Sequence, residues 1–172
     1  MPRAEVRRLL HTDDRSQFTS GNIELDRFFQ RYAGQNQFRH HIGTTYVAVD
    51  DDRILGFATV SAAEIEVVEL PKARRRRLPG YPLPVLRLAR LAVDQRAQSQ
   101  GLGLLLLKAV FLLAQRMADE IGCVGVLVDA KPEAVSFYER YGFEPMEVQQ
   151  GQLGDRPEPI AMFLELGAIP GR

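Results

Sequence analysis

The chain has 172 residues, of which 45% are hydrophobic and 26% are charged, a composition typical of a globular fold and not of a disordered chain. Its 22 basic and 22 acidic residues cancel, which excludes a global electrostatic field that would draw the protein to nucleic acid. The length, with no internal repeat and no linker, predicts a single domain over residues 1–172.

The single cysteine and the N-terminal sequence bear on the compartment. Cys123 has no second cysteine for an internal disulfide, which fits a reducing compartment. The first residues, MPRAEVRRLLHTDD, lack the apolar segment of a secretion signal, and no stretch of the chain reaches transmembrane length. We therefore expect a cytoplasmic protein that does not bind a membrane. No metal-ligand spacing occurs in the sequence, so we expect no metal.

The first elements in chain order are a strand over residues 5–10 and an amphipathic helix from residue 23 to about residue 38. Asn22 directly precedes the helix and is a residue type that caps helix N-termini. Four apolar residues follow the helical spacing i, i+3, i+4 and i+7, namely Leu25, Phe28, Phe29 and Tyr32. We expect this stripe to lie in the core, and His40 and His41 beyond the helix to lie at the surface.

Three further strands are predicted next. Residues 44–49 and 54–60 flank an acidic turn and form an antiparallel hairpin, and another strand covers about residues 64–68. Residues 70–84 contain four prolines and a glycine, so we expect a loop that contributes little to the core.

This loop carries the densest basic cluster of the chain: Lys72, Arg74, Arg75, Arg76 and Arg77. Such a cluster is equally typical of a solvated surface loop and of an arm that contacts the phosphates of a polyanionic substrate. The sequence does not decide between the two.

A strand over residues 85–93, a polar segment and an apolar helix over residues 103–121 follow. Gly101 and Gly103 lie at the start of the helix, where the backbone can approach an anion and the first N–H groups point at it. This order is typical of a phosphate-binding loop. An ordinary turn that needs glycine for its φ angles has the same pattern.

The last predicted elements are a buried strand over residues 124–128, a helix over residues 133–141 with Pro132 at its start, and strands over residues 143–148 and 160–166. Together the predicted elements form a mixed sheet with helices on both faces.

Two motifs resemble those of the GNAT acetyltransferases. The segment QSQGLG at residues 98–103 resembles the Q/R-x-x-G-x-G/A signature of that family, and SFYERYGF at residues 136–143 resembles its FY-x-x-x-GF segment. The resemblance implies an α/β GNAT fold, with a mixed central sheet flanked by helices. It also implies an N-acetyltransferase that uses acetyl-coenzyme A (acetyl-CoA).

The resemblance also implies the residues of the site. Backbone groups of the central strand would bind the pantetheine arm and the loop would bind the pyrophosphate; the corresponding residues are Leu91, Ala92, Val93, Gln98, Ser99, Gln100, Gly101, Leu102 and Gly103. Tyr138 would be the general acid, since a phenol of pKa ~10 can protonate a thiolate whose thiol has a pKa of ~8.5. Tyr141, on the same helix face, is the second candidate.

No residue is singled out as a general base. Glu64, Glu66 and Glu69 lie where some members of the family keep a carboxylate, but no motif selects one of them. An α-amine has a pKa of ~7.7–8.0 and is partly neutral without a base, whereas a lysine amine at ~10.4 is not. The missing base therefore favours an α-amine as the acceptor.

A narrower resemblance covers nearly the whole chain. FTSGNIELD at residues 18–26, RLPGYPLPV at 77–85 and LARLAVD at 88–94 resemble the GNAT toxins of toxin–antitoxin pairs. This resemblance implies a toxin that acetylates the α-amine of aminoacyl-tRNA and blocks translation, is neutralised by a ribbon-helix-helix antitoxin and often forms a homodimer. It makes Arg75, Arg76, Arg77 and Arg90 candidate contacts to the tRNA.

Two alternatives to the toxin function stay open at this point. One is a GNAT enzyme that acetylates a small amine or a protein N-terminus, in which case the arginine cluster has no role toward the substrate. The other is a module that binds acetyl-CoA without catalysis.

Overall fold

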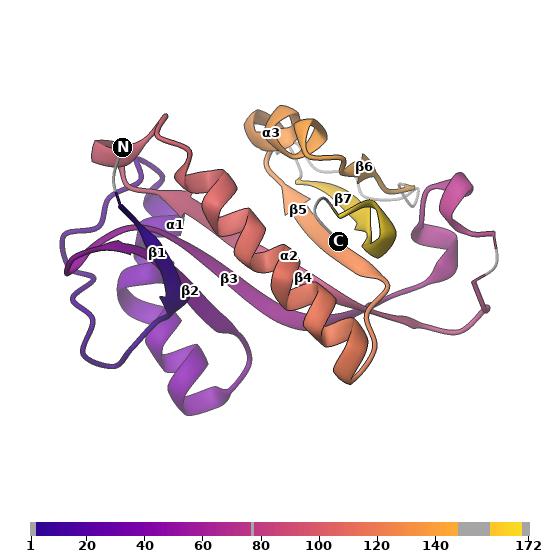
Figure 1. Ribbon diagram of the computed structural model, residues 1–172, viewed down its shortest axis with the longest axis horizontal. Coiled ribbons are helices and arrows are strands. Elements are labelled where there is room, and N and C mark those ends of the chain that lie inside the picture. The colour runs from indigo at the N-terminus through magenta and orange to yellow at the C-terminus, as the bar shows by residue number, and fades with distance from the viewer. Residues whose placement is uncertain (1–2, 77, 148–158, 170–172) are drawn as a thin grey trace. The chain divides into compact units, whose positions relative to one another are not determined.

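The computed structural model describes residues 3–76, 78–147 and 159–169 (Figure 1). Within them seven strands form one sheet in the order β1-β2-β3-β4-β5-β7-β6. The strands are β1 Glu5–Arg8, β2 Thr44–Asp50, β3 Arg53–Ile65, β4 Leu83–Val93, β5 Gly125–Ala130, β6 Glu144–Pro145 and β7 Ile160–Glu165. The α-helices are α1 Ile23–Arg27, α2 Leu102–Glu120 and α3 Val135–Arg140. Apart from the separate strand predicted at residues 64–68, these are the predicted elements in the predicted order.

The strand pairings make the sheet a mixed one. The pairs β1–β2, β2–β3, β5–β7 and β6–β7 are antiparallel. The neighbours β4 and β5 are instead joined through α2, the kind of crossover connection that parallel strands need. The chain forms two compact units, Met1–Ser61 with Leu88–Leu112, and Ala62–Arg87 with Leu113–Arg172.

The core of the first unit is built around Phe57 on β3. Its ring stacks on Phe29 at 4.4 Å between centroids and meets the edge of Phe18 at 5.5 Å. Gly56 precedes it because a Cβ there would lie 3.0 Å from the Ala92 carbonyl oxygen and from the Leu106 side chain. The buried residues of this cluster are Leu9, Phe18, Phe28, Phe29, Ala33, Val47, Val49, Ile54, Phe57 and Ala92.

The first predicted helix is present, and its N-cap is confirmed. The Asn22 side chain accepts a hydrogen bond from the Leu25 N–H at 3.1 Å. Beyond α1 the helix continues through two π-helical segments, Phe28–Tyr32 and Gln35–His40. Burial recurs five residues apart in this part of the helix, at Phe28 and Phe29 and again at Ala33 and Gly34. The wider π turn therefore rotates Tyr32 out of the core; it is 47% exposed, and the prediction that it is a core residue is wrong.

The separate strand predicted at residues 64–68 is wrong. Residues 64 and 65 end the 13-residue strand β3, and Val67–Glu69 form a 3₁₀ turn. The Glu69 carboxylate accepts the Glu66 N–H at 2.8 Å, and this capping contact favours the turn over an extended backbone.

In the second unit, β5 pairs with β7 at close range. A Cβ at Gly125 would lie 2.3 Å from the Leu164 carbonyl oxygen, so only glycine fits there. The strand β6 is much shorter than the predicted 143–148, since Pro145 has no N–H to donate, and residue 148 lies outside the described residues.

The loop before β4 is part of the core of the second unit, against expectation. Leu70 is 0% exposed and Leu78 is partly buried, and both pack in the cluster of Ile65, Val85 and Phe163. Leu83, predicted as a loop residue, is the first residue of β4 and is 3% exposed. The prediction that residues 70–84 contribute little to the core is therefore wrong.

The two helices near the predicted motifs begin and end close to their expected positions. The helix α2 starts at Leu102, and the Gly122 N–H, at a φ of 110°, donates to the Met117 carbonyl at 2.7 Å and closes its C-terminus. The helix α3 follows a 3₁₀ turn, Pro132–Ala134, and stops before Gly142, which has a φ of 97°. Over the described residues, no helix is both long and apolar enough to span a bilayer.

Candidate functional site

The loop between β4 and α2 has the backbone of an anion-binding site. Ser99 and Gly101 are left-handed, with φ of 64° and 80°, whereas Gln98 is extended. Such alternation can turn consecutive N–H groups toward one point. A Cβ at Gly101 would meet no atom within 4 Å, so the space beside it is open. The strain of a left-handed serine is typical of a functional loop.

The start of α2 adds further donors to this loop. The helix begins at Leu102, and the Leu105 N–H already bonds to the Gly101 carbonyl at 3.1 Å. The N–H groups of residues 102–104 have no acceptor inside the helix, and the helix dipole favours a negative charge before them. Five of the predicted cofactor residues thus lie in one turn, which we call the anion-binding turn: Ser99, Gln100, Gly101, Leu102 and Gly103. That this turn binds a pyrophosphate stays a prediction.

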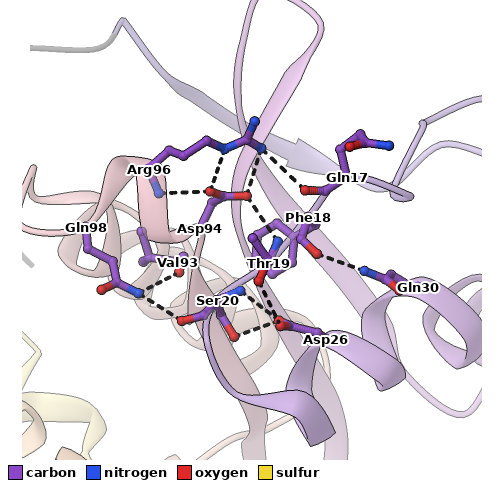
Figure 2. A network of polar contacts seen from close by, with 10 residues as sticks. All are labelled: Gln17, Phe18, Thr19, Ser20, Asp26, Gln30, Val93, Asp94, Arg96 and Gln98. Carbon is purple, nitrogen blue, oxygen red and sulfur yellow. Dashed lines mark hydrogen bonds and ion pairs between the residues drawn. The ribbon is translucent and has the colours of Figure 1, made fainter.

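Asp94 holds this loop in place, a role that the sequence motif did not reveal (Figure 2). Its side chain is fully buried and accepts hydrogen bonds from the Thr19 N–H at 3.2 Å and the Arg96 N–H at 2.9 Å. The Arg96 guanidinium contacts both carboxylate oxygens, at 3.0 and 3.1 Å. Burial alone would raise the pKa of Asp94, but these hydrogen bonds outweigh it and hold the pKa below its usual value. In the sequence, the one feature that could have indicated this role is the position of Asp94 directly after an apolar strand.

Gln98 ties the same loop to the segment before α1. Its amide nitrogen donates to the Ser20 carbonyl at 3.0 Å and to the Val93 carbonyl at 3.2 Å (Figure 2). The side-chain amide of Gln98 and the carbonyl of Val93 therefore have partners inside the chain. Contacts from these two residues to the cofactor would then come from their backbone N–H groups. Leu91 and Ala92, on the same strand, stay predictions.

The segment before α1 is itself ordered by Asp26. This carboxylate accepts the Ser20 N–H at 2.9 Å and the Ser20 hydroxyl at 2.7 Å. Gly21, with a φ of 92°, passes so close to Gln95 that a Cβ would lie 2.6 Å from the amide nitrogen of that side chain. The start of α1 and the anion-binding turn are thus one connected structure within the first unit.

Tyr138 lies in the second unit and is 5% exposed. Its ring is held edge-on by Phe137 at 5.1 Å and Phe143 at 5.3 Å. Burial raises the pKa of Tyr138 above its usual value, so its hydroxyl keeps the proton at neutral pH. None of the hydrogen bonds among the described residues involves this hydroxyl, although buried tyrosines usually bond theirs. Tyr141 is less buried and contacts the other edge of this cluster, through Phe137.

The arginine loop divides into structural and exposed members. Arg74 pairs with Glu144 and Glu165, at 3.0 and 2.8 Å. Arg75 donates to the carbonyl oxygens of Leu70 at 3.0 Å and Val68 at 2.8 Å.

The remaining basic residues of this loop are placed differently. Lys72 and Arg76 are exposed, and Arg77 lies outside the described residues. Arg76 is thus the described arginine of the loop that is most open to a substrate.

Arg90 lies in the first unit, on β4. The carbon of its guanidinium is 3.7 Å from the centroid of the Phe28 ring. This cation–π contact anchors β4 to the π-helical segment Phe28–Tyr32. Arg87, which precedes it on the strand, pairs with Asp129.

Neither a base nor a metal site is distinguished within the residues that the structure describes. Glu64 and Glu66 are exposed, and Glu69 is engaged with the Glu66 N–H. No group of three His, Cys, Asp or Glu side chains in the described ranges is arranged to hold a metal ion.

Comparison with known proteins identifies relatives of this chain. The family model described as an acetyltransferase (GNAT) domain matches residues 41–145. A tRNA-acetylating toxin of Mycobacterium tuberculosis (strain ATCC 25618 / H37Rv) is 34% identical over 139 residues, which cover 80% of this chain and 82% of the toxin.

Solved structures share the fold. AtaT complexed with acetyl-methionyl-tRNAfMet is 24% identical with a TM-score of 0.82, covering 96% of each chain. A tyrosine-to-phenylalanine mutant of the AtaT toxin bound to the C-terminus of the antitoxin AtaR is 22% identical with a TM-score of 0.75, covering 96% of this chain and 94% of AtaT.

Proposed function

The chain belongs to the GNAT acetyltransferase family, and we propose that it transfers the acetyl group of acetyl-CoA to the α-amine of an aminoacyl-tRNA. The predicted α/β GNAT fold is confirmed, and so is the predicted class of enzyme, an acetyl-CoA-dependent N-acetyltransferase. The observation that carries the choice of acceptor is the likeness to a tRNA-acetylating toxin along four fifths of this chain.

The anion-binding turn supports acetyl-CoA as the donor. The N–H groups that follow the left-handed residues Ser99 and Gly101 would bind the pyrophosphate, and β4 would hold the pantetheine arm along its backbone. When bound, acetyl-CoA supplies the acetyl group as a thioester whose sulfur leaves with a negative charge.

We assign Tyr138 as the general acid that protonates this sulfur. Its ring is fixed by two aromatic neighbours, its hydroxyl has no bonding partner among the described residues, and it is protonated at neutral pH. The N–C bond to the acceptor then forms as the C–S bond breaks, and the tyrosine proton passes to the sulfur. The amine loses its proton to water, and water returns a proton to the tyrosinate. No protein base is required, since an α-amine of pKa ~7.7–8.0 is partly neutral at pH 7.

The proposed acceptor also determines the cellular effect, the compartment and the partners that we propose. Acetylated aminoacyl-tRNA cannot form a new peptide bond through its amine, so the enzyme would block translation as a toxin. Aminoacyl-tRNA and acetyl-CoA meet in the cytoplasm, which is where we place the protein. A ribbon-helix-helix antitoxin and a homodimer, both implied by the resemblance to GNAT toxins, are its proposed partners; the AtaT–AtaR complex supports the first.

One experiment tests the function. The purified protein is incubated with aminoacyl-tRNA and acetyl-labelled acetyl-CoA, and mild alkali then releases the amino acid from the tRNA. We expect the label on the released N-acetyl-amino acid. Label found only on free amines or on protein N-termini would replace the tRNA acceptor by a small-amine or protein acceptor.

A further inference from the structure

A second basic pocket lies in the first unit, away from the anion-binding turn in sequence. It has a volume of about 280 Å³ and is lined by His11, Arg15, Gly34, Gln35, Phe38 and Arg39. The loop after β1 and the π-helical segment Gln35–His40 supply these residues. None of them belongs to the loop of residues 94–103, so this pocket is a separate site, which we call the π-helix pocket.

The π-helix pocket is cationic although the chain has no net charge. Arg15 and Arg39 carry full positive charges, and none of the six lining residues is acidic. Two acids lie close in sequence to Arg15. Asp14 accepts the Ser16 N–H at 2.9 Å and the Ser16 hydroxyl at 2.6 Å, and Asp13 is bound to Arg7 by two hydrogen bonds of 2.8 Å and accepts the Leu10 N–H. Asp13 forms an ion pair with Arg7, and neither aspartate lines the pocket, so the lining itself is net positive.

Arg15 is held in the pocket by the protein. Its Nη1 donates to the Phe29 carbonyl at 2.9 Å, the one hydrogen bond that its side chain makes within the described part of the chain. A guanidinium has five N–H donors, so most of them remain for a ligand. Burial lowers the pKa of Arg15, and an anion bound beside it would offset the cost of keeping this cation out of water.

Gly34 makes room for this guanidinium. Glycine inside a helix costs ~1 kcal/mol relative to alanine. The φ of Gly34 is −64°, an ordinary helical value, so the backbone does not require glycine. A Cβ there would instead lie 2.9 Å from Nη2 of Arg15 and 3.2 Å from Nη1. A side chain at residue 34 would therefore push the guanidinium of Arg15 from its present place.

An aromatic pair completes the lining. The rings of His11 and Phe38 stack at 3.7 Å between centroids, with 26° between their planes. Flat rings beside guanidinium groups are the combination that proteins use for single-stranded and looped RNA. A volume of about 280 Å³ lies at the lower end of small-molecule pockets, which suits a phosphodiester unit better than a whole coenzyme A.

We propose that the π-helix pocket binds a backbone phosphate of the RNA acceptor, through Arg15 and Arg39. This inference rests on the proposed function, because it takes the acceptor to be a tRNA. It also moves part of the RNA contact away from the arginine loop, two of whose arginines are engaged in holding that loop.

Filter binding of uncharged tRNA across a salt series tests the pocket. Arg39→Ala removes an exposed side chain, so the fold should be unaffected. We expect tRNA binding about three- to tenfold weaker and a salt dependence reduced by roughly one unit of log K per log salt, the effect of one lost phosphate contact. Arg31→Ala is the matched control, since Arg31 is exposed on the same helix outside the pocket. The KM for acetyl-CoA should be unchanged in both variants.

The outcomes separate this inference from the proposed function. Equal tRNA binding by Arg39→Ala, Arg31→Ala and wild type would overturn the pocket even if wild type acetylates aminoacyl-tRNA. A raised KM for acetyl-CoA with unchanged tRNA binding would assign the phosphate to coenzyme A, and would also overturn it. A wild type that binds tRNA with the expected Arg39 effect, but transfers no acetyl group to any aminoacyl-tRNA, would support the pocket and refute the function.

Discussion

Asp94→Asn is the substitution that most directly tests how the anion-binding turn is held. The carboxylate is fully buried and gives one oxygen to the Thr19 N–H and the other to the Arg96 N–H. An asparagine of the same shape keeps one acceptor oxygen and turns an NH₂ group toward the other donor. The turn and the segment before α1 should therefore separate at one of these two contacts.

The size of the effect follows from these contacts. A hydrogen bond to a charged acceptor contributes about 1.5–3 kcal/mol, and a buried donor left unpaired costs about 1–3 kcal/mol. Thr19 is exposed, so water can satisfy part of what is lost, and the Arg96 side chain is 54% exposed, which screens its ion pair. We expect a loss of ~2 kcal/mol at pH 7, which lowers Tm by about 4–8 °C in a chain of this size.

The pH dependence has a definite sign. The folded-state pKa of Asp94 lies below its unfolded value, so its charge stabilises the fold above the unfolded pKa of ~3.9. That contribution is lost as the pH falls from there through the folded pKa. The difference between wild type and Asp94→Asn should hold from pH 5 to pH 8 and shrink below about pH 4.

Thermal unfolding followed by circular dichroism checks both statements. Asp52→Asn, in the exposed turn between β2 and β3, is the control for removing one negative charge. A Tm of Asp94→Asn within about 1 °C of wild type at pH 7 would refute the view that Asp94 holds the turn. A difference that grows below pH 4 would refute the lowered pKa.

Four further substitutions test the other parts of the site. Tyr138→Phe should lower kcat roughly 10²- to 10⁴-fold with little change in the KM for acetyl-CoA; full turnover in steady-state assays would reassign the acid. Gly101→Ala fits the open space but not the φ of 80°, so it should cost ~1–2 kcal/mol in chemical denaturation and weaken acetyl-CoA binding in calorimetry. Arg75→Ala removes two hydrogen bonds to carbonyl groups and should lower the free energy of unfolding by about 1–2 kcal/mol, whereas Arg76→Ala should change it by no more than about 0.5 kcal/mol. Equal unfolding midpoints for the two variants would contradict the structural role of Arg75.

The elements and the anion-binding turn could be predicted from the sequence because they depend on local spacing. Alternating apolar residues mark β4, the N-cap Asn22 marks the start of α1, and Gly101 marks a left-handed turn. Each of these signals acts within a few residues, through backbone sterics and the hydrophobic period. The same signals failed where the period changed, at the π-helical turn that exposes Tyr32.

The partners of the charged groups were decided only by the tertiary structure. Asp94 bonds to Thr19, 75 residues away, and Arg74 pairs with Glu165, 91 residues away. In the basic cluster, which the sequence left open as a surface loop or a polyanion-binding arm, Arg74 and Arg75 hold their own loop, while Arg15 lies with Arg39 beside a glycine that leaves space for it. Local sequence determines which residues form a helix, strand or turn. Which charge meets which depends on how segments distant in sequence pack together, and no pattern within one segment carries that information.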